Sequence, residues 1–345
     1  MKTRIALITT TLFMSAATTG VTSHAATSAS ADDHAFKAAE PADPHAVLGN
    51  ESCVKCHAPE IQVWKNTPHA TTFDQLHRRP EAKAIAKKLG LDSIKHSGRC
   101  VACHYTQQTS ESGDIHTVAG VSCESCHGAA KGWLERHHDY GGQGITRLNE
   151  SPEHRQQRIA HSVAAGMRNP ANVYSVAQSC LRCHTTADEE LVNVGGHSAG
   201  SLDFEFVSWS QGLVRHNFVR SDGKINQASS PERLRLMFVA GMIAELEASL
   251  RATAIATQKA TYGVTAAKRA ARAGARLKSV NSKVDEPLID QIVHLFSSVK
   301  LQLNNQTQLT EAANQIAKLG HQFAETTQAD LSPLDTFIPK SDLYK

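Results

Sequence analysis

Every cysteine in the chain lies in the same five-residue pattern, Cys-x-x-Cys-His. The 345 residues contain eight cysteines, and these form four pentads at residues 53–57, 100–104, 123–127 and 180–184. A random chain of this composition would contain roughly 0.01 such pentads, so the pattern is not accidental. Any fold of this chain must therefore accommodate four copies of the same cysteine and histidine motif.

The pentad suits covalent attachment of haem. Two cysteines separated by two residues can form thioethers to the two vinyl groups of one porphyrin, and the histidine that follows is held against the iron. The sequence therefore predicts four c-type haems as cofactors. Their attachment residues are Cys53, Cys56, Cys100, Cys103, Cys123, Cys126, Cys180 and Cys183, and their proximal iron ligands are His57, His104, His127 and His184.

Three other uses of paired cysteines explain the pattern less well. Structural zinc sites could combine the first pentad with the second and the third with the fourth, but zinc does not require a histidine after every second cysteine. A disulfide framework is typical of much smaller exported domains. A thioredoxin-like redox site needs one pair in a βαβ setting, whereas this chain has four.

The first 25 residues indicate export. Lys2 and Arg4 precede an apolar run that is too short to span a bilayer, and small residues end at Ala25, as in a secretory signal peptide. No other segment is apolar enough to cross a membrane, so we expect no integral membrane segment in the mature chain and a periplasmic location. Removing two basic residues and no acid lowers the net charge from +3 to +1, which disfavours a nucleic-acid partner.

The ligand on the other side of each iron is less constrained by sequence. Methionine is an unfavoured candidate, since few methionines remain in the mature chain and Met237 and Met242 have the spacing of helix core. Local context favours four histidines as distal ligands and three others more weakly. The favoured four are His69, His137, His197 and His216, and the weaker three are His96, His116 and His161.

The segment that contains the pentads resembles the tetrahaem cytochrome c-554 family of ammonia-oxidising bacteria. The resemblance rests on residues 53–57 followed by 64–70 (WKNTPHA), and on residues 120–128 (GVSCESCHG) followed by His137. It covers residues 51 to about 185. It implies a mostly helical chain with closely stacked haems, an electron-transfer role, and hydroxylamine oxidoreductase as the kind of partner such a cytochrome serves.

The resemblance also implies a ligand arrangement. His69 and His137 would serve haems other than those attached to their own pentads, and one haem, by order along the chain the second at His104, would be five-coordinate. The chain departs from the family after residue 185. An additional histidine such as His197, beside Gly195 and Gly196, could close the open position.

The predicted fold is mainly α, with short helices and loops around four haems followed by a C-terminal helical bundle. We expect a signal peptide at 1–25, a flexible leader at 26–45, a tetrahaem domain at 46–225, a helical domain at 226–335 and a tail at 336–345. Ser230 and Pro231 predict a helix start, and further helices are expected near 264–280, 287–303 and 310–327. An aromatic-rich run at 204–209 suggests a strand.

Residues 251–283 contain eight basic residues and no acid. These are Arg251, Lys259, Lys268, Arg269, Arg272, Arg276, Lys278 and Lys283. They suit a solvated helix face, haem propionates or an acidic redox partner.

Three functions are compatible with the sequence. The leading hypothesis is an extracytoplasmic carrier of electrons between a donor dehydrogenase or quinol oxidase and a terminal reductase, rather than an enzyme. The alternative is a reductase or oxidase of a small nitrogen or sulfur oxide at one five-coordinate haem. A third is a docking subunit that binds its partner through the helical C-terminal third.

Overall fold

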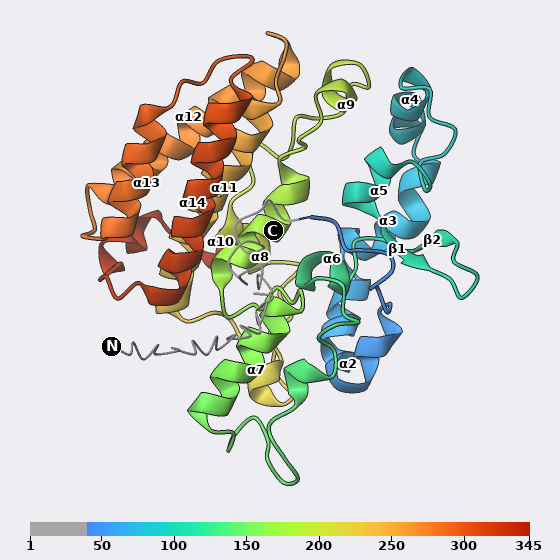
Figure 1. Ribbon diagram of the computed structural model, residues 1–345, viewed down its shortest axis with the longest axis vertical. Helices are drawn as coiled ribbons and strands as arrows, with labels where there is room; N and C mark the ends of the chain where they lie inside the picture. Colours follow the sequence, from blue (N-terminus) through green and yellow to red (C-terminus); the bar gives the residue numbers. More distant parts are fainter. Residues whose placement is uncertain (1–39) are drawn as a thin grey trace, which may run out of the picture.

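The computed structural model describes residues 40–345 and is mainly helical, as the sequence predicts (Figure 1). The predicted signal peptide and most of the predicted leader lie outside the described residues. Within them, the only sheet is a two-stranded antiparallel one, and no helix is long and apolar enough to cross a membrane.

The four pentads all lie on short helices. The elements of this part are α2 (Glu51–Lys65), α3 (Pro68–Gln75), α4 (Pro80–Lys88), α5 (Gly98–His104), β1 (Thr106–Thr109), β2 (Ile115–Ala119), α6 (Cys123–His127), α7 (Pro152–Ala164), α8 (Val173–His184), α9 (Glu189–Asn193) and α10 (Phe206–Ser210). Helices α5, α6 and α8 end at the histidine of their pentad. In α2 the helix kinks at His57, two residues before Pro59, which cannot donate a backbone hydrogen bond.

Several helices begin with the same local signature, a capping hydroxyl followed by proline. Thr67, Ser151 and Ser230 accept hydrogen bonds from the first turns of α3, α7 and α11 (Pro231–Ala254). A side-chain oxygen satisfies a backbone N–H that the helix leaves unpaired, and proline at the first position needs no hydrogen bond. The helix start predicted at Ser230 is confirmed.

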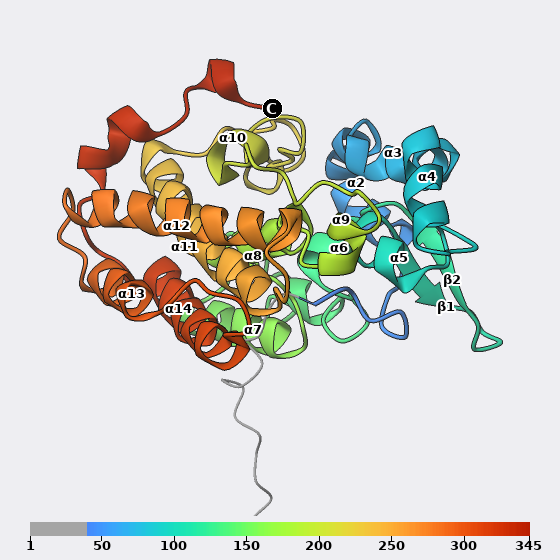
Figure 2. The same cartoon turned by 90° about the horizontal axis from the view of Figure 1, so that it is seen from above.

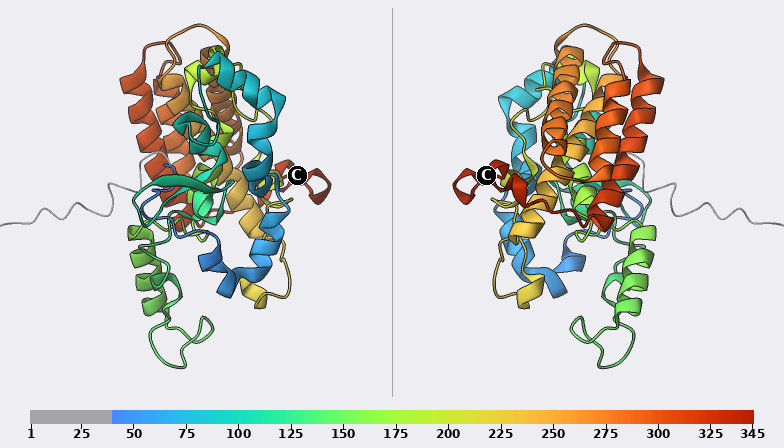
Figure 3. Two further views of the ribbon diagram at one scale, coloured as in Figure 1. Left: turned by 90° about the vertical axis from the view of Figure 1, so that its right-hand side faces the viewer. Right: turned by 90° about the vertical axis from the view of Figure 1, so that its left-hand side faces the viewer.

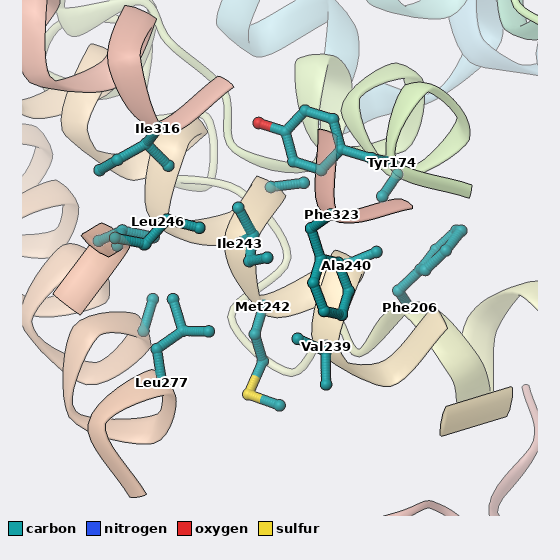
Figure 4. Packing of buried hydrophobic residues seen from close by; sticks show 14 of the residues in the cluster. Tyr174, Phe206, Val239, Ala240, Met242, Ile243, Leu246, Leu277, Ile316 and Phe323 are labelled. Carbon is teal, nitrogen blue, oxygen red and sulfur yellow. The ribbon is translucent and has the colours of Figure 1, made fainter. Parts of the chain in front are cut away.

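The C-terminal third is a bundle of four helices, shown in colours from gold (α11) through orange to red in Figures 1 and 2. Helix α11 is followed by α12 (Thr261–Asn281), α13 (Pro287–Ser298) and α14 (Gln306–Thr326). Helix α11 is buried over most of its length between α12 and α14. The view in Figure 4 shows Val239, Ile243 and Leu246 of α11 packed between Leu277 of α12 and the α14 side chains Ile316 and Phe323.

The core of this bundle includes side chains from the part of the chain that carries the pentads. Tyr174 and Leu181 of α8 and Phe206 of α10 are buried in the same hydrophobic cluster as the bundle helices (Figure 4). A Cβ on Gly320 of α14 would lie 2.3 Å from the Tyr174 ring, so the two helices approach closely at this glycine. The helix that carries the fourth pentad therefore contributes side chains to the core of the C-terminal bundle.

Two local predictions are corrected. Residues 206–210 form helix α10 and not a strand, because Glu205 accepts hydrogen bonds from the backbone N–H groups of Val207 and Ser208 and so begins a helix. Helix α13 ends at Ser298, short of the expected 303. The final residues pack beside α10, where the Lys345 N–H donates to the Ser208 carbonyl (Figure 2). Figure 3 shows the last segment of the chain, in red, at one side of the molecule.

The basic stretch at 251–283 is only partly a solvated face. Glu245, which is 3% exposed on α11, binds the guanidinium groups of Arg269, Arg272 and Arg276 at 3.1 Å each. Arg251 binds Glu247 at 2.8 Å. Four of the eight basic side chains therefore neutralise two buried acids within the bundle, while Lys259, Lys268, Lys278 and Lys283 are exposed.

Candidate functional site

Each pentad histidine faces one histidine from elsewhere in the chain. The ring centroids are 6.3 Å apart for His57 and His137, 6.2 Å for His184 and His69, 6.2 Å for His104 and His197, and 6.1 Å for His127 and His216. The second members are the four histidines that the sequence favoured as distal ligands. In no case does a pentad pair with the candidate nearest to it downstream.

The spacing of these pairs fits one metal ion between two imidazoles. A bond of about 2.0 Å from metal to ring nitrogen, plus about 1.1 Å from that nitrogen to the ring centre, places the two centroids about 6.2 Å apart. All four observed separations lie within 0.1 Å of this value. The residues present therefore fit four six-coordinate haem irons.

Burial keeps most of these rings in the neutral form that binds metal. It lowers the pKa of His104, His127 and His184 to about 4. Burial also lowers the pKa of His69 and His137 below the usual value. Because a protonated imidazole has no free nitrogen lone pair, neutrality at pH 7 is a requirement for ligation.

Backbone carbonyls orient three of the distal rings. Nδ1 of His137 lies against the Leu134 carbonyl, that of His197 is 2.8 Å from the Ser198 carbonyl, and that of His216 is 2.6 Å from the Val214 carbonyl. A carbonyl can only accept, so Nδ1 carries the proton and Nε2 presents a lone pair. This is the tautomer required for ligation through Nε2.

The pentads contact one another in a definite order. Glu124, inside the third pentad, accepts hydrogen bonds from the N–H groups of Leu48 and Gly49, which lead into α2 and the first pentad. The Cys123 N–H also donates to the side-chain oxygen of Asn50, directly before α2, at 3.4 Å.

The remaining links involve the fourth pentad. Ser179 of α8 donates to the carbonyl of Cys126 in the third pentad at 3.2 Å, and Arg182 donates to the carbonyl of Ala102 in the second. The contact order is therefore first, third, fourth and second.

The histidine of the fourth pentad, His184, contacts aromatic rings, a hydroxyl and an arginine. The His184 ring stacks on Phe204 at 4.9 Å and meets Trp209 edge-on at 5.1 Å, while its Nδ1 lies 2.9 Å from the Ser201 hydroxyl. The His184 carbonyl accepts a hydrogen bond from Arg269 of α12 at 2.8 Å. The surroundings of His184 therefore come both from residues near the fourth pentad and from helix α12 of the bundle.

The weaker histidine candidates make contacts other than with the pentad histidines. His96 contacts the Ser93 hydroxyl, His116 lies on β2 with its Nδ1 3.5 Å from the Asp114 carbonyl, and His161 is in the last turn of α7. None of the three forms a ring contact with a pentad histidine among the described residues. The neighbour of His137, His138, points toward Glu135 at 3.6 Å.

Sequence reasoning missed two charged residues that organise the site. Glu124 is 1% exposed and binds three backbone N–H groups, including that of Ala130 at 2.8 Å. Arg99, directly before the second pentad, binds Asp188 and Glu190 at 2.9 and 2.8 Å. The sequence signal was their position: Glu124 lies inside a pentad and Arg99 directly before one. A charged side chain at such a place must find a partner when the pentad is buried.

A buried ion pair supports the loop that carries His137. Arg158 of α7 binds both carboxylate oxygens of Glu150, at 2.7 and 2.6 Å, and donates to the His137 carbonyl at 2.6 Å. The hydrogen bond from Arg158, aided by His154, lowers the pKa of Glu150 from 4.5 to about 2. The charged carboxylate is therefore favoured by the folded state.

Replacing Glu150 with glutamine should make the stability of the protein less dependent on pH in acid. Because the folded pKa is below the ordinary value, this pair stabilises the fold fully above about pH 4.5 and loses that contribution as the pH falls to about 2. Melting temperatures of wild type and variant should therefore converge across this window. The exposed Glu153→Gln change on the same helix is the control, and parallel curves for Glu150→Gln and wild type would refute the prediction.

Comparison with known proteins agrees with the motifs. Residues 52–128 match the family model described as cytochrome c554 and c-prime. Cytochrome c-554 of Nitrosomonas europaea is 34% identical over 104 residues, which cover 27% of this chain and 43% of that protein. The chain thus matches less than half the length of this curated relative, and no solved structure matches it.

The resemblance inferred from the pentads is confirmed for residues 52–128. The matched residues contain the first three pentads, so the family match agrees with the c-type haem attachment predicted there. His197, His216 and the C-terminal bundle lie outside the residues that match the family model.

Proposed function

We propose that this protein is a periplasmic tetrahaem cytochrome that carries electrons between redox protein partners. The observation that carries the proposal is the set of four histidine pairs, each with the separation that one six-coordinate iron requires. The pentad cysteines would attach the haems, and each pair would supply the two axial ligands. When bound, the haems supply redox centres that accept and release single electrons.

The chain determines which centres are neighbours and what surrounds them. Glu124, Ser179 and Arg182 fix the contact order of the pentads as first, third, fourth and second. Partial burial of His104, His127 and His184 lowers the pKa of each to about 4 and so keeps the proximal rings neutral. Paired neutral histidines in such sites favour electron transfer at low potential over binding of a substrate.

The alternative function, reduction or oxidation of a small nitrogen or sulfur oxide, needs an iron with a free position. Each pentad histidine here faces a second histidine, including His104 at the second site, which faces His197. No observation on the described residues favours this chemistry.

The location and partners follow from the same proposal. The signal-like segment at 1–25 and the export-dependent chemistry of c-type haem attachment support the periplasm. A donor dehydrogenase or quinol oxidase and a terminal reductase are the partner classes. Of the basic stretch, the exposed lysines at 259, 268, 278 and 283 are the part available to an acidic partner.

Haem counting and redox titration test the proposal together. We expect the purified full-length protein to carry four covalent haems by mass spectrometry of the denatured chain. All four should be reduced and reoxidised reversibly by one electron each. Fewer than four haems, or catalytic turnover of nitrite, hydroxylamine or sulfite by the loaded protein, would count against it.

A further inference from the structure

His197 is carried by a short segment that lies between two other parts of the protein. Its N–H donates to the Leu191 carbonyl of α9 at 3.1 Å, so the position of the ring follows that of this helix. Figure 1 shows α9 between the C-terminal bundle and the α4 and α5 helices. What holds α9 therefore sets the distance between His197 and His104.

One anchor comes from the second pentad itself. Arg99 of α5, next to Cys100, binds Asp188 at 2.9 Å and Glu190 at 2.8 Å. Asp188 also caps α9, since its Oδ1 accepts the Leu191 N–H at 2.9 Å. One guanidinium thus ties the helix that ends at His104 to the first turn of the helix that leads to His197.

The other anchor comes from the C-terminal bundle. Glu189 accepts hydrogen bonds from the Thr257 N–H and hydroxyl at 3.0 and 2.8 Å, and from the Gln258 N–H at 3.0 Å. Asn193 accepts the Tyr262 N–H at 2.9 Å. One small buried cluster joins α9 to α11 and α12, and it consists of Val192, Ala252, Ala256, Tyr262 and Ala266.

The turn from α9 to His197 depends on a close backbone approach. A Cβ on Gly195 would lie 2.5 Å from the Leu191 carbonyl oxygen and 3.0 Å from Leu89. Only glycine therefore lets the chain pass between α9 and the residue that follows α4. The segment that leads to His197 is therefore held by Arg99, by the C-terminal bundle and by the close approach at Gly195.

We propose that Arg99 and Glu189 are positioning residues that hold His197 opposite His104. Residues 188–190 alternate between the two anchors, so α9 connects the second pentad to the C-terminal bundle. The sixth position of the second haem then depends on the bundle, which closes that iron to small external ligands. This inference rests on the proposed function, because it assumes that the His104 and His197 pair ligates iron.

The Arg99 ion pairs can be removed without unfolding the protein. The side chains of Arg99, Asp188 and Glu190 are 30%, 28% and 59% exposed, and ion pairs this open contribute little to global stability. Removing Arg99 should therefore leave the protein folded and change only the position of α9.

The test uses the full-length, haem-loaded protein with Arg99→Ala and Glu189→Ala. In each variant we expect the high-spin ferric fraction of the second haem to rise at least about tenfold, and cyanide to bind one haem of the four. EPR and the Soret difference spectrum measure the two effects. Arg235→Ala, which removes a bidentate pair with Asp335 at 2.6 and 2.7 Å elsewhere in the bundle, is the matched control.

His197→Ala separates this inference from the proposed function. If His197→Ala opens one iron but the two anchor variants remain low-spin and inert to cyanide, the anchoring role is wrong while the ligand pair stands. If His197→Ala leaves the spectrum unchanged, the ligand pair itself is wrong. An equal opening in Arg235→Ala would also overturn the anchoring role, since the effect would then not be specific to α9.

Discussion

Replacing His69 with alanine should convert the fourth haem, and not the first, from low spin to high spin. His69 lies just after the first pentad, yet its ring faces His184 of the fourth at 6.2 Å. Loss of the sixth ligand should also raise the potential of that haem by on the order of 100 mV, within the range of about 0.8 V that axial ligands span. EPR and a redox titration of the loaded protein measure both effects.

The haem that changes can be identified by deletion of one attachment site at a time. In a background with Cys180→Ala and Cys183→Ala, which removes the fourth covalent haem, His69→Ala should add no high-spin signal. In a background with Cys53→Ala and Cys56→Ala it should still do so. His96→Ala is the control for loss of a histidine on the exposed surface. The reverse pattern in the two backgrounds would contradict the crossed pairing of His69 and His184.

Replacing Glu245 with alanine should destabilise the protein by about 3–5 kcal/mol, the usual cost of leaving buried charges unpaired. The carboxylate is 4% exposed and binds three guanidinium groups, of which that of Arg269 is 2% exposed. Arg269 also donates to the His184 carbonyl, so the same change should loosen the fourth haem site. Urea unfolding followed by circular dichroism measures the first effect, and EPR line shape at the fourth haem the second.

Two variants isolate the role of charge at this position. Glu245→Gln keeps the shape of the side chain but removes the charge, and should cost more than half as much as alanine if the arginines are the cause. Glu232→Ala removes an exposed acid 3.9 Å from Arg235 on the same helix and should leave the free energy of unfolding essentially unchanged. A cost below about 1 kcal/mol for Glu245→Ala would mean that the arginines find other partners.

Local features of this protein could be predicted from sequence and distant pairings could not. The pentads and the helix that starts at Ser230 are set by a few neighbouring residues, which a single sequence displays. His197 and His216 were recognised as candidates from their context. Which proximal histidine each one faces depends on how α9 and the 211–218 loop pack, and no local pattern encodes that.

The errors have the same origin. Arg269, Arg272 and Arg276 suggested a solvated face because their partner, Glu245, lies on another helix among apolar neighbours. The acids at 245 and 247 inside an otherwise apolar stripe were the available indication of an internal ion cluster. Where a strand was expected at 204–209, residues 206–210 form a helix because the capping contacts of Glu205 outweigh the β-propensity of its aromatic neighbours.

The central claim is that all four irons are held between two histidines, including the second, where His197 faces His104 at 6.2 Å. The EPR spectrum of the oxidised, full-length protein tests it most directly. The account predicts that integration gives four low-spin ferric haems per chain and no high-spin signal. A high-spin signal equal to one haem per chain would contradict it, because one iron would then lack its second histidine.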